Sequence, residues 1–261
     1  MARRRMLITI SALLLLAGPT ATAQESSDDL ARRVAALERQ QRETLRDLTE
    51  IKRLLAVALQ GGTVPAAEVA GNRLLLHDNP VQGDPDAPLT LIEFTDYECG
   101  YCARYHREAY PQIVAAYVAT GRVRYVTLDL PLESLHPLSF RAARATHCAE
   151  EQGKFWEMQD RLFTNKQFLG AWAAHAEAVG LEAEAFLACL DSDRHASAVR
   201  RDASEAAKVG ASGTPAFVIA RTLPGEPREV ESLVGLRGAQ PFSVFAAELD
   251  RALAEVESRT P

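Results

Sequence analysis

Two cysteines stand close together in the stretch ECGYCARYH, residues 98–106, where Cys99 and Cys102 enclose a glycine and a tyrosine. Such a pair can bind a metal, form a structural disulfide or exchange disulfides with another molecule. Zinc ordinarily needs four ligands, and the sequence has neither a second CxxC nor a spaced Cys/His pair, so we expect no metal and no other cofactor. A disulfide in so small a ring is strained and easily reduced, which argues against a purely structural use. The pair therefore predicts thiol–disulfide exchange.

The two sulfurs are expected to have different roles. Cys99 lies where the apolar run LTLIEFTD, residues 89–96, turns into a helix-like segment. Unpaired N–H groups and the helix dipole favour a thiolate at such a position, where thiol pKa values fall by several units. We therefore predict that Cys99 is the nucleophile. Cys102, one turn further into the helix, is then the resolving thiol that releases a mixed disulfide.

The first residues predict export. Three arginines precede the apolar run MLITISALLLLAG, and the small residues ATA end at position 23, as expected of a signal peptide over residues 1–23. The alternative is an uncleaved N-terminal anchor. The formal net charge is −6, and loss of the three arginines in residues 1–23 makes it −9, which does not fit a nucleic-acid partner. We expect a periplasmic protein, in a compartment where its four cysteines can be oxidised.

A heptad pattern follows in residues 24–59. Apolar residues recur at the a and d positions from Leu30 to Leu55, with polar interruptions at Gln41 and Thr44. The pattern predicts a coiled-coil helix that joins copies of the chain through residues 30–58. The alternative is an amphipathic helix folded back onto its own domain. Residues 60–72 contain the glycines and the proline of a linker.

Strand and helix signals alternate beyond the linker. Apolar or alternating runs at residues 73–77, 89–96 and 122–130 predict strands, and a helix is expected from about Tyr101 to Thr120. Residues 137–208 look almost wholly helical, with breaks near Gly170, Gly180 and Ser192. Two further strands, AFVIA and REVESLVG, and a helix from about Phe242 to Glu257 complete the pattern. The order predicts an α/β fold with a helical insertion.

The paired motifs FTDYECGYC and GTPAFVIA resemble the active site and the cis-proline loop of the thioredoxin superfamily. The helical insertion, with its segment HCAEEQGKFWEMQDRLF, is similar to that of exported DsbA-like proteins. The resemblance covers roughly residues 73–257 and leaves the heptads outside. It implies a thioredoxin fold and thiol:disulfide oxidoreductase activity on protein substrates.

The resemblance also implies roles for individual residues. Pro215 should follow a cis peptide bond and, with Thr214, lie beside Cys99 and pair with an extended substrate chain. Glu93, six residues before Cys99, corresponds to a buried acid that relays a proton to Cys102, with a raised pKa. A solvent-facing glutamate is the alternative. His136 precedes Pro137 at an expected helix start, where it caps the helix or contributes to the site.

Cys148 and Cys189 both lie in the helical block, 41 residues apart. We favour a structural disulfide between them, which would stabilise the fold by about 3 to 4 kcal/mol in the chain-entropy model. The alternative is two buried free thiols.

Three redox roles remain open: donating, shuffling or reducing disulfides. The Gly100-Tyr101 pair resembles that of DsbC isomerases, Thr214 before the proline is similar to the isomerase and reductase pattern, and the heptads would bring several sites to one substrate. We therefore favour an oligomeric isomerase or reductase over a DsbA-type oxidase. Its partners would be unfolded or misoxidised exported proteins and a membrane redox partner. A non-catalytic coiled-coil scaffold with a thioredoxin fold is the alternative of another class.

Overall fold

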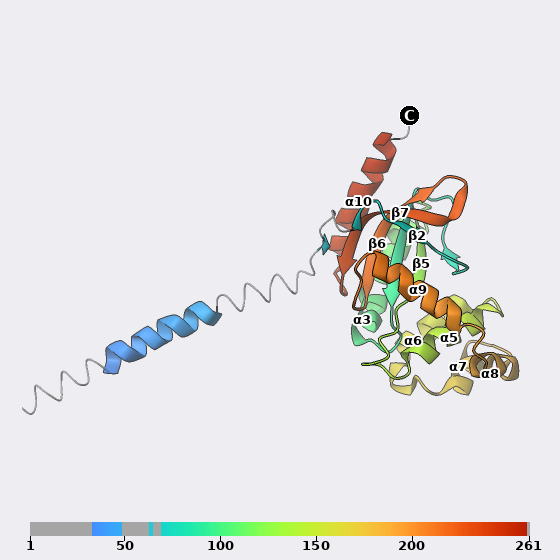
Figure 1. Ribbon diagram of the computed structural model, residues 1–261, viewed down its shortest axis with the longest axis horizontal. Helices are drawn as coiled ribbons and strands as arrows, with labels where there is room; N and C mark the ends of the chain where they lie inside the picture. The colour runs from blue at the N-terminus through green and yellow to red at the C-terminus, as the bar shows by residue number, and fades with distance from the viewer. Residues whose placement is uncertain (1–32, 49–62, 65–68, 260–261) are drawn as a thin grey trace, which may run out of the picture. The chain divides into compact units, whose positions relative to one another are not determined.

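The structure is a computed structural model that describes residues 33–48, 63–64 and 69–259. The chain divides into two units, Met1–Ala56 and Val57–Pro261. In the first unit, residues 33–48 form the helix drawn in blue in Figure 1, which confirms an N-terminal helix. Val34, Leu37 and Leu48, at expected a and d positions, are between 46% and 64% exposed. The expected signal peptide, 1–23, and the rest of the heptad segment lie outside the described residues.

The second unit is built on a mixed sheet of seven described strands. The order along the sheet is β1-β7-β6-β4-β5-β3, and β2 also pairs with β7. The central β4 runs parallel to β5 and antiparallel to β6. The strands are β1 (Thr63–Val64), β2 (Arg73–Leu75), β3 (Val81–Gln82), β4 (Leu89–Thr95), β5 (Val123–Asp129), β6 (Ala216–Leu223) and β7 (Glu226–Arg237).

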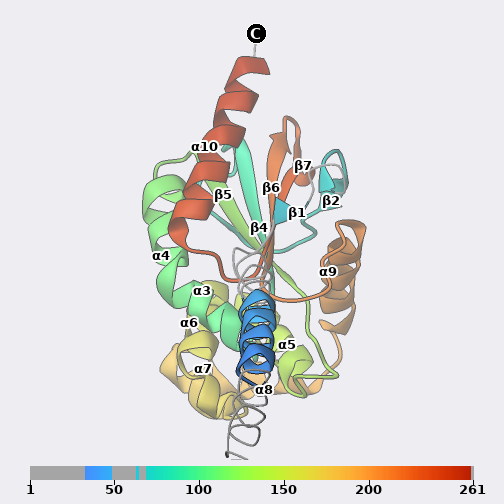
Figure 2. The ribbon, with the colours of Figure 1, turned by 90° about the vertical axis from the view of Figure 1, so that its left-hand side faces the viewer.

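Helices cover both faces of this sheet and one of its ends. Figure 2 shows α3, α4 and α10 on one side of the sheet, α9 on the other, and α5 to α8 below its end. The helical elements are α3 (Gly100–Glu108), α4 (Tyr110–Ile113), the π-helical η1 (Val114–Val118), α5 (Ser139–Glu150), α6 (Phe155–Thr164), the 3-10 turn η2 (Lys166–Phe168), α7 (Trp172–Ala178), α8 (Ala183–Asp191), α9 (Ala196–Lys208) and α10 (Phe242–Arg259). This arrangement confirms the thioredoxin fold with a helical insertion.

The alternation of side chains along β4 explains the two layers. Leu91 packs with Tyr105 of α3 and Phe245 of α10 on one face. Ile92 and Phe94 face the other way and pack in the cluster that includes Ala206 of α9. All seven residues of β4 are buried, as expected for a central strand covered on both faces. Glu93, which shares its face with Leu91, is therefore buried under α3.

The structure corrects several expected boundaries. The helix expected over Tyr101 to Thr120 is interrupted after Glu108, where Pro111 has no N–H to continue the hydrogen bonding and a π-helical turn follows. The helical block has a further break between α5 and α6, at Gly153 with a φ of +68°. Two short strands were missed: β3 in the turn-rich residues 78–88, and β1 inside the expected linker 60–72. Neither two-residue strand has a periodicity to reveal it.

Candidate active site

Cys99 and Cys102 lie at the start of α3, directly after β4. Cys99 is the N-cap residue of α3, and Cys102 is completely buried one turn later. Both are free thiols. Between them, Tyr101 is 62% exposed. The strand thus delivers one thiol to the positive end of a helix dipole and places the other inside the protein.

The surroundings favour the thiolate on one sulfur and the thiol on the other. A hydrogen bond from Cys102, assisted by the Thr214 side chain and backbone N–H groups of α3, lowers the pKa of Cys99 to about 5 against the opposing effect of burial. Burial, Cys99 and the charge of Glu93 raise the pKa of Cys102 well above its ordinary value. At neutral pH this site can therefore present a reactive thiolate at Cys99 and store a proton on Cys102.

The segment before β6 lies against Cys99. The Thr214–Pro215 peptide bond is cis. The Cys99 thiol donates to the backbone oxygen of Thr214 at 3.4 Å. A cavity of about 260 Å³ runs along this segment, and its lining includes Arg237 and Gly238. The cavity along this loop leaves room for an extended peptide beside the segment that contacts the sulfur.

Glu93 lies in a buried polar group under α3. Its carboxylate is 0% exposed and accepts hydrogen bonds from Thr95 at 2.7 Å, from His106 at 3.0 Å and from the Tyr125 hydroxyl. The inward orientation agrees with the strand alternation, and the solvent-facing alternative is wrong. The structure adds His106 and Tyr125, which sequence reasoning did not assign to the site. The only signal for His106 was its position four residues after Cys102, on the same helix face.

A second buried carboxylate fixes the turn that leads to Cys99. Asp96 accepts the backbone N–H of Glu98 and of Leu132, each at 2.8 Å. His136 Nδ1 also lies 2.8 Å from Asp96 Oδ2. His136 is therefore joined to the turn before the active site, as part of the scaffold of Cys99. It contacts no sulfur in any described hydrogen bond.

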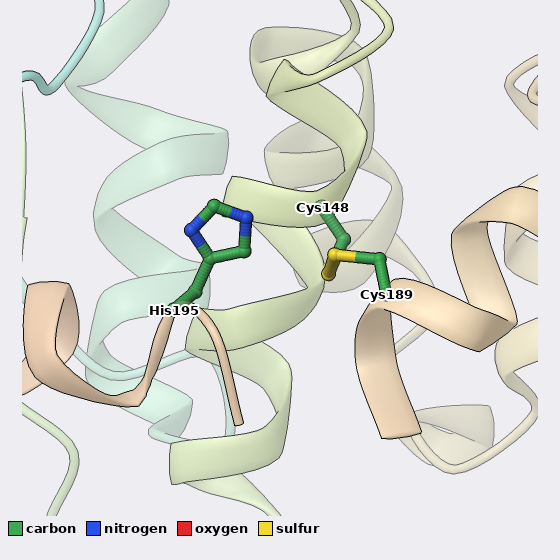
Figure 3. A group of neighbouring side chains, drawn as sticks. All are labelled: Cys148, Cys189 and His195. Atoms are coloured by element: carbon green, nitrogen blue, oxygen red, sulfur yellow. A yellow bond between two sulfur atoms is a disulfide. The ribbon is translucent and has the colours of Figure 1, made fainter. Parts of the chain in front are cut away.

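Cys148 of α5 and Cys189 of α8 are joined by a disulfide, with Cα atoms 5.8 Å apart. Both are buried in the core of the helical insertion. In Figure 3, His195, in the segment that leads into α9, lies on the side of the disulfide opposite Cys189. Because the two sulfurs are bonded to each other, they are not thiolate ligands for a metal.

A third polar cluster lies at the end of β5. His147 Nε2 is 2.8 Å from Asp129 Oδ2, and Asp202 accepts the backbone N–H of Asp129 and the side-chain amide of Asn79. Burial and the charge of Asp129 raise the pKa of Asp202 to about 8. Burial opposes a charged His147, but its hydrogen bond to the Asp129 carboxylate and the charge of that carboxylate outweigh burial and raise the pKa of His147. Within the described part of the chain, this cluster has the donor types of a metal site.

The fold and the paired thiols define a class: the DsbA-like thiol:disulfide oxidoreductase fold of the thioredoxin superfamily. The family model described as thioredoxin matches residues 76–236, more than half of the 261 residues. The chain therefore belongs to the thioredoxin family.

Solved structures agree with this assignment of the fold. Oxidised BdbD from Bacillus subtilis is 21% identical with a TM-score of 0.60, and the match covers 71% of this chain and 98% of that one. Wolbachia pipientis alpha-DsbA1 is 23% identical with a TM-score of 0.59, covering 72% and 97%. A thioredoxin-like oxidoreductase from Silicibacter pomeroyi is 28% identical with a TM-score of 0.55, covering 68% and 95%.

The curated proteins that this chain resembles in sequence are named as Na(+)/H(+) antiporters. The chain is 34% identical over 169 residues to the Na(+)/H(+) antiporter NhaA 3 of Salinispora tropica, covering 64% of this chain and 25% of the relative. It is 38% identical over 169 residues to NhaA 1 of a Mycobacterium species, covering 59% and 25%. The chain thus spans about a quarter of the length of these relatives. Among the helices of the described residues, none combines the length and apolar character needed to cross a membrane.

Proposed function

We propose that this protein is an exported thiol:disulfide oxidoreductase that acts on protein substrates through Cys99 and Cys102. The observation that supports this best is the pairing of a thiolate-stabilised Cys99, 3.4 Å from the Thr214 backbone oxygen, with a buried Cys102. The Cys148–Cys189 disulfide is proposed to be structural, because both of its cysteines are buried and bonded to each other, whereas Cys99 and Cys102 are free thiols.

The proposed exchange conserves electrons. The Cys99 thiolate attacks a disulfide in the substrate, forms a mixed disulfide and releases one substrate sulfur as a thiolate. Attack by another substrate thiolate then returns Cys99 and leaves a rearranged substrate. Attack by Cys102 instead forms the Cys99–Cys102 disulfide and leaves the substrate reduced. The reverse of both steps oxidises a substrate dithiol: one substrate thiolate attacks the Cys99–Cys102 disulfide at Cys99, and the second then displaces Cys99 as a thiolate.

Exposed apolar side chains near Cys99 support a protein substrate. Leu138 is 37% exposed, and its N–H donates to Glu98, the neighbour of Cys99. Phe168, in the η2 turn, is 63% exposed. The ammonium of Lys166 in the same turn lies close to Gly100. Leu138, Phe168 and Tyr101 form an apolar rim beside the thiol, and Lys166 adds a positive charge to it. Such a rim suits the unfolded segments of a client protein.

We favour the isomerase role for this site. Gly100 and Tyr101, Thr214 before the cis-proline, and the exposed a and d residues of the helix over 33–48 support it together. A parallel coiled coil through residues 30–58 would place several copies of Cys99 around one substrate. The disulfide-donating oxidase is the second candidate, because a Cys99 pKa of about 5 makes the reduced form a favoured product.

The proposed compartment follows from the sequence of residues 1–23, which we propose to be a cleaved signal peptide. In the periplasm the clients would be unfolded or misoxidised exported proteins. A membrane redox partner would return Cys99 and Cys102 to the state in which they work.

Two assays test these proposals on the mature protein. Insulin turbidity with dithiothreitol measures reduction, and recovery of scrambled ribonuclease measures isomerisation. The isomerase proposal expects ribonuclease recovery that is lost in Cys99→Ser and reduced in Leu37→Glu/Leu48→Glu. Ala36→Glu, at an exposed position off the a and d stripe, is the matched control and should retain activity and oligomer mass. No reaction in either assay would favour the non-catalytic scaffold.

A further inference from the structure

The two oxygens of Glu93 have different neighbours. Oε1 accepts the Thr95 hydroxyl at 2.7 Å, and Thr95 also hydrogen-bonds to the Cys102 thiol. Oε2 accepts the Tyr125 hydroxyl and lies 3.0 Å from His106 Nε2. One oxygen of Glu93 thus faces the buried thiol through a single hydroxyl, and the other is fixed by two side chains from β5 and α3.

The imidazole of His106 is itself held by aromatic rings on two sides. Phe163 of α6 stacks on it at 4.0 Å between ring centroids, with the rings 22° from parallel. Tyr110 of α4 lies 4.6 Å away. The His106 side chain is 6% exposed. The ring therefore has little freedom, and its Nε2 stays directed at the carboxylate.

From this geometry we propose that His106 is a positioning residue for Glu93. It holds Oε2, together with Tyr125, so that the carboxylate stays oriented with Oε1 against the Thr95 hydroxyl, ready to take the Cys102 proton. The inference rests on the proposed function, because it concerns the step in which Cys102 resolves a mixed disulfide.

Protons and electrons balance in that step. Cys102 Sγ attacks Cys99 Sγ, the bond between the two cysteines forms, and the bond from Cys99 to the substrate sulfur breaks. The substrate sulfur leaves with the electron pair as a thiolate. The Cys102 proton passes to the Thr95 hydroxyl, which gives its own proton to Glu93 Oε1. A carboxylate that lacks the hydrogen bond from His106 can turn away from Thr95, so its Oε1 is less often in place to accept that proton.

Titratable side chains surround His106 on the elements that pack against it, which are β5, α3, α4 and α6. Other than Glu93, the titratable groups in this surrounding are phenols, a thiol and one more carboxylate on α6. They are Tyr125 of β5, Tyr105 and Cys102 of α3, Tyr110 of α4, and Asp160, whose charge acts on Tyr110.

The test follows two successive releases of thionitrobenzoate from 5,5′-dithiobis(2-nitrobenzoate) by the reduced full-length protein in a stopped-flow instrument. The first release reports attack by Cys99, and the second reports attack by Cys102 on the mixed disulfide. The Cys148–Cys189 disulfide has no free thiol, so while it is intact it releases no thionitrobenzoate. We expect His106→Phe, which keeps an aromatic ring in the stack, to slow the second phase at least tenfold at pH 7. The first phase should stay within twofold.

Two further variants separate hydrogen bonding from packing. His106→Gln keeps a side-chain donor and is expected to recover most of the lost rate. Tyr110→Phe is the matched control, since its hydroxyl bonds to Gln82 instead of Glu93, and it should behave as the wild type. If His106→Phe does not fold, Tyr125→Phe removes the other donor to the same oxygen and should also slow the second phase.

The outcomes are distinct. If the second phase of His106→Phe has the wild-type rate, the inference is overturned. The same holds for Tyr125→Phe where that variant replaces His106→Phe. Equal slowing in His106→Phe and His106→Gln also overturns it, since donor chemistry would then be irrelevant. A wild-type protein whose second phase does not require Cys102, as judged with Cys102→Ser, contradicts the proposed function itself.

Discussion

The acidity of Cys99 depends first on the sulfur three residues further along α3. The hydrogen bond from Cys102 is the largest cause of the lowered pKa, ahead of Thr214 and the backbone N–H groups. Removing the donor with Cys102→Ala should therefore move the thiolate titration of Cys99 to higher pH. Cys102→Ser keeps a hydroxyl donor at the same place and should titrate close to the wild-type value of about 5.

The expected size can be worked from the titration. At pH 7, two pH units above a pKa of about 5, ionisation of Cys99 stabilises the reduced protein by at most about 2.7 kcal/mol. Partial solvent exposure of the sulfur screens this interaction, so we expect about half, ~1.4 kcal/mol. That energy corresponds to about 30 mV in the reduction potential of a two-electron couple. Because the thiolate stabilises the reduced protein, it raises the reduction potential and makes the Cys99–Cys102 pair more oxidising.

The same lowered pKa fixes the direction of a pH effect on stability. A depressed thiol pKa adds stability to the reduced protein that is complete above the ordinary value near 9. This stability is lost as the pH falls through about 5. Reduced wild type should therefore lose stability relative to Cys99→Ser between pH 9 and pH 5. Thiolate absorbance at 240 nm gives the midpoints, and thermal unfolding gives the stability difference.

The contrast between alanine and serine decides the cause. We expect the midpoint in Cys102→Ala to rise by at least one pH unit, and the midpoint in Cys102→Ser to rise by less than half of that. If both variants titrate with the wild type, the helix N-terminus alone lowers the pKa, and the hydrogen-bond account is wrong. Near-ultraviolet circular dichroism checks that both variants keep the native packing.

Three further predictions concern the insertion, the buried acids and the surface. Cys148→Ala/Cys189→Ala should lower the free energy of unfolding by about 3 to 4 kcal/mol in urea, with an unchanged Cys99 reaction rate; an unchanged midpoint would contradict a structural role. A raised carboxyl pKa gives stability that is complete below pH 4 and lost as the pH rises through about 8, so Asp202→Asn should flatten the fall in Tm between pH 5 and 9. Parallel curves would be evidence against that. Phe168→Ser and Leu138→Ser should raise KM for an unfolded protein substrate about threefold to tenfold. Exposed Leu75→Ser on β2 should not, and equal effects would refute the apolar rim.

Much of the fold was predictable because the long elements have clear periodicity. The order of strands and helices, the covered sheet and the positions of Cys99 and Cys102 follow from patterns that repeat within a few residues. β1 and β3 were missed because two residues have no periodicity. The break at Pro111 was missed because a proline also fits the first turn of a helix, which is where it lies in α4.

The buried polar contacts were harder to predict, since they join distant parts of the chain. His106 meets Glu93 because α3 lies over β4, and Tyr125 reaches the same oxygen because β5 lies beside β4 in parallel. Asp96 and His136 are 40 residues apart. In the sequence alone, each of these polar residues would be expected on the protein surface. Its buried partner is known only once the elements that carry the two residues are packed together.

The acidity of Cys99 serves the chemistry of both candidate roles. An isomerase needs a free thiolate at rest, and a pKa of about 5 provides one at neutral pH. An oxidase needs a thiolate that leaves easily when a substrate thiol attacks, and a weakly basic sulfur does that as well. What separates the roles lies outside the thiol pair. If the helix over 33–48 joins several copies and the resting protein is reduced, shuffling is favoured; if a redox partner keeps Cys99 and Cys102 oxidised in a monomer, the same chemistry donates disulfides.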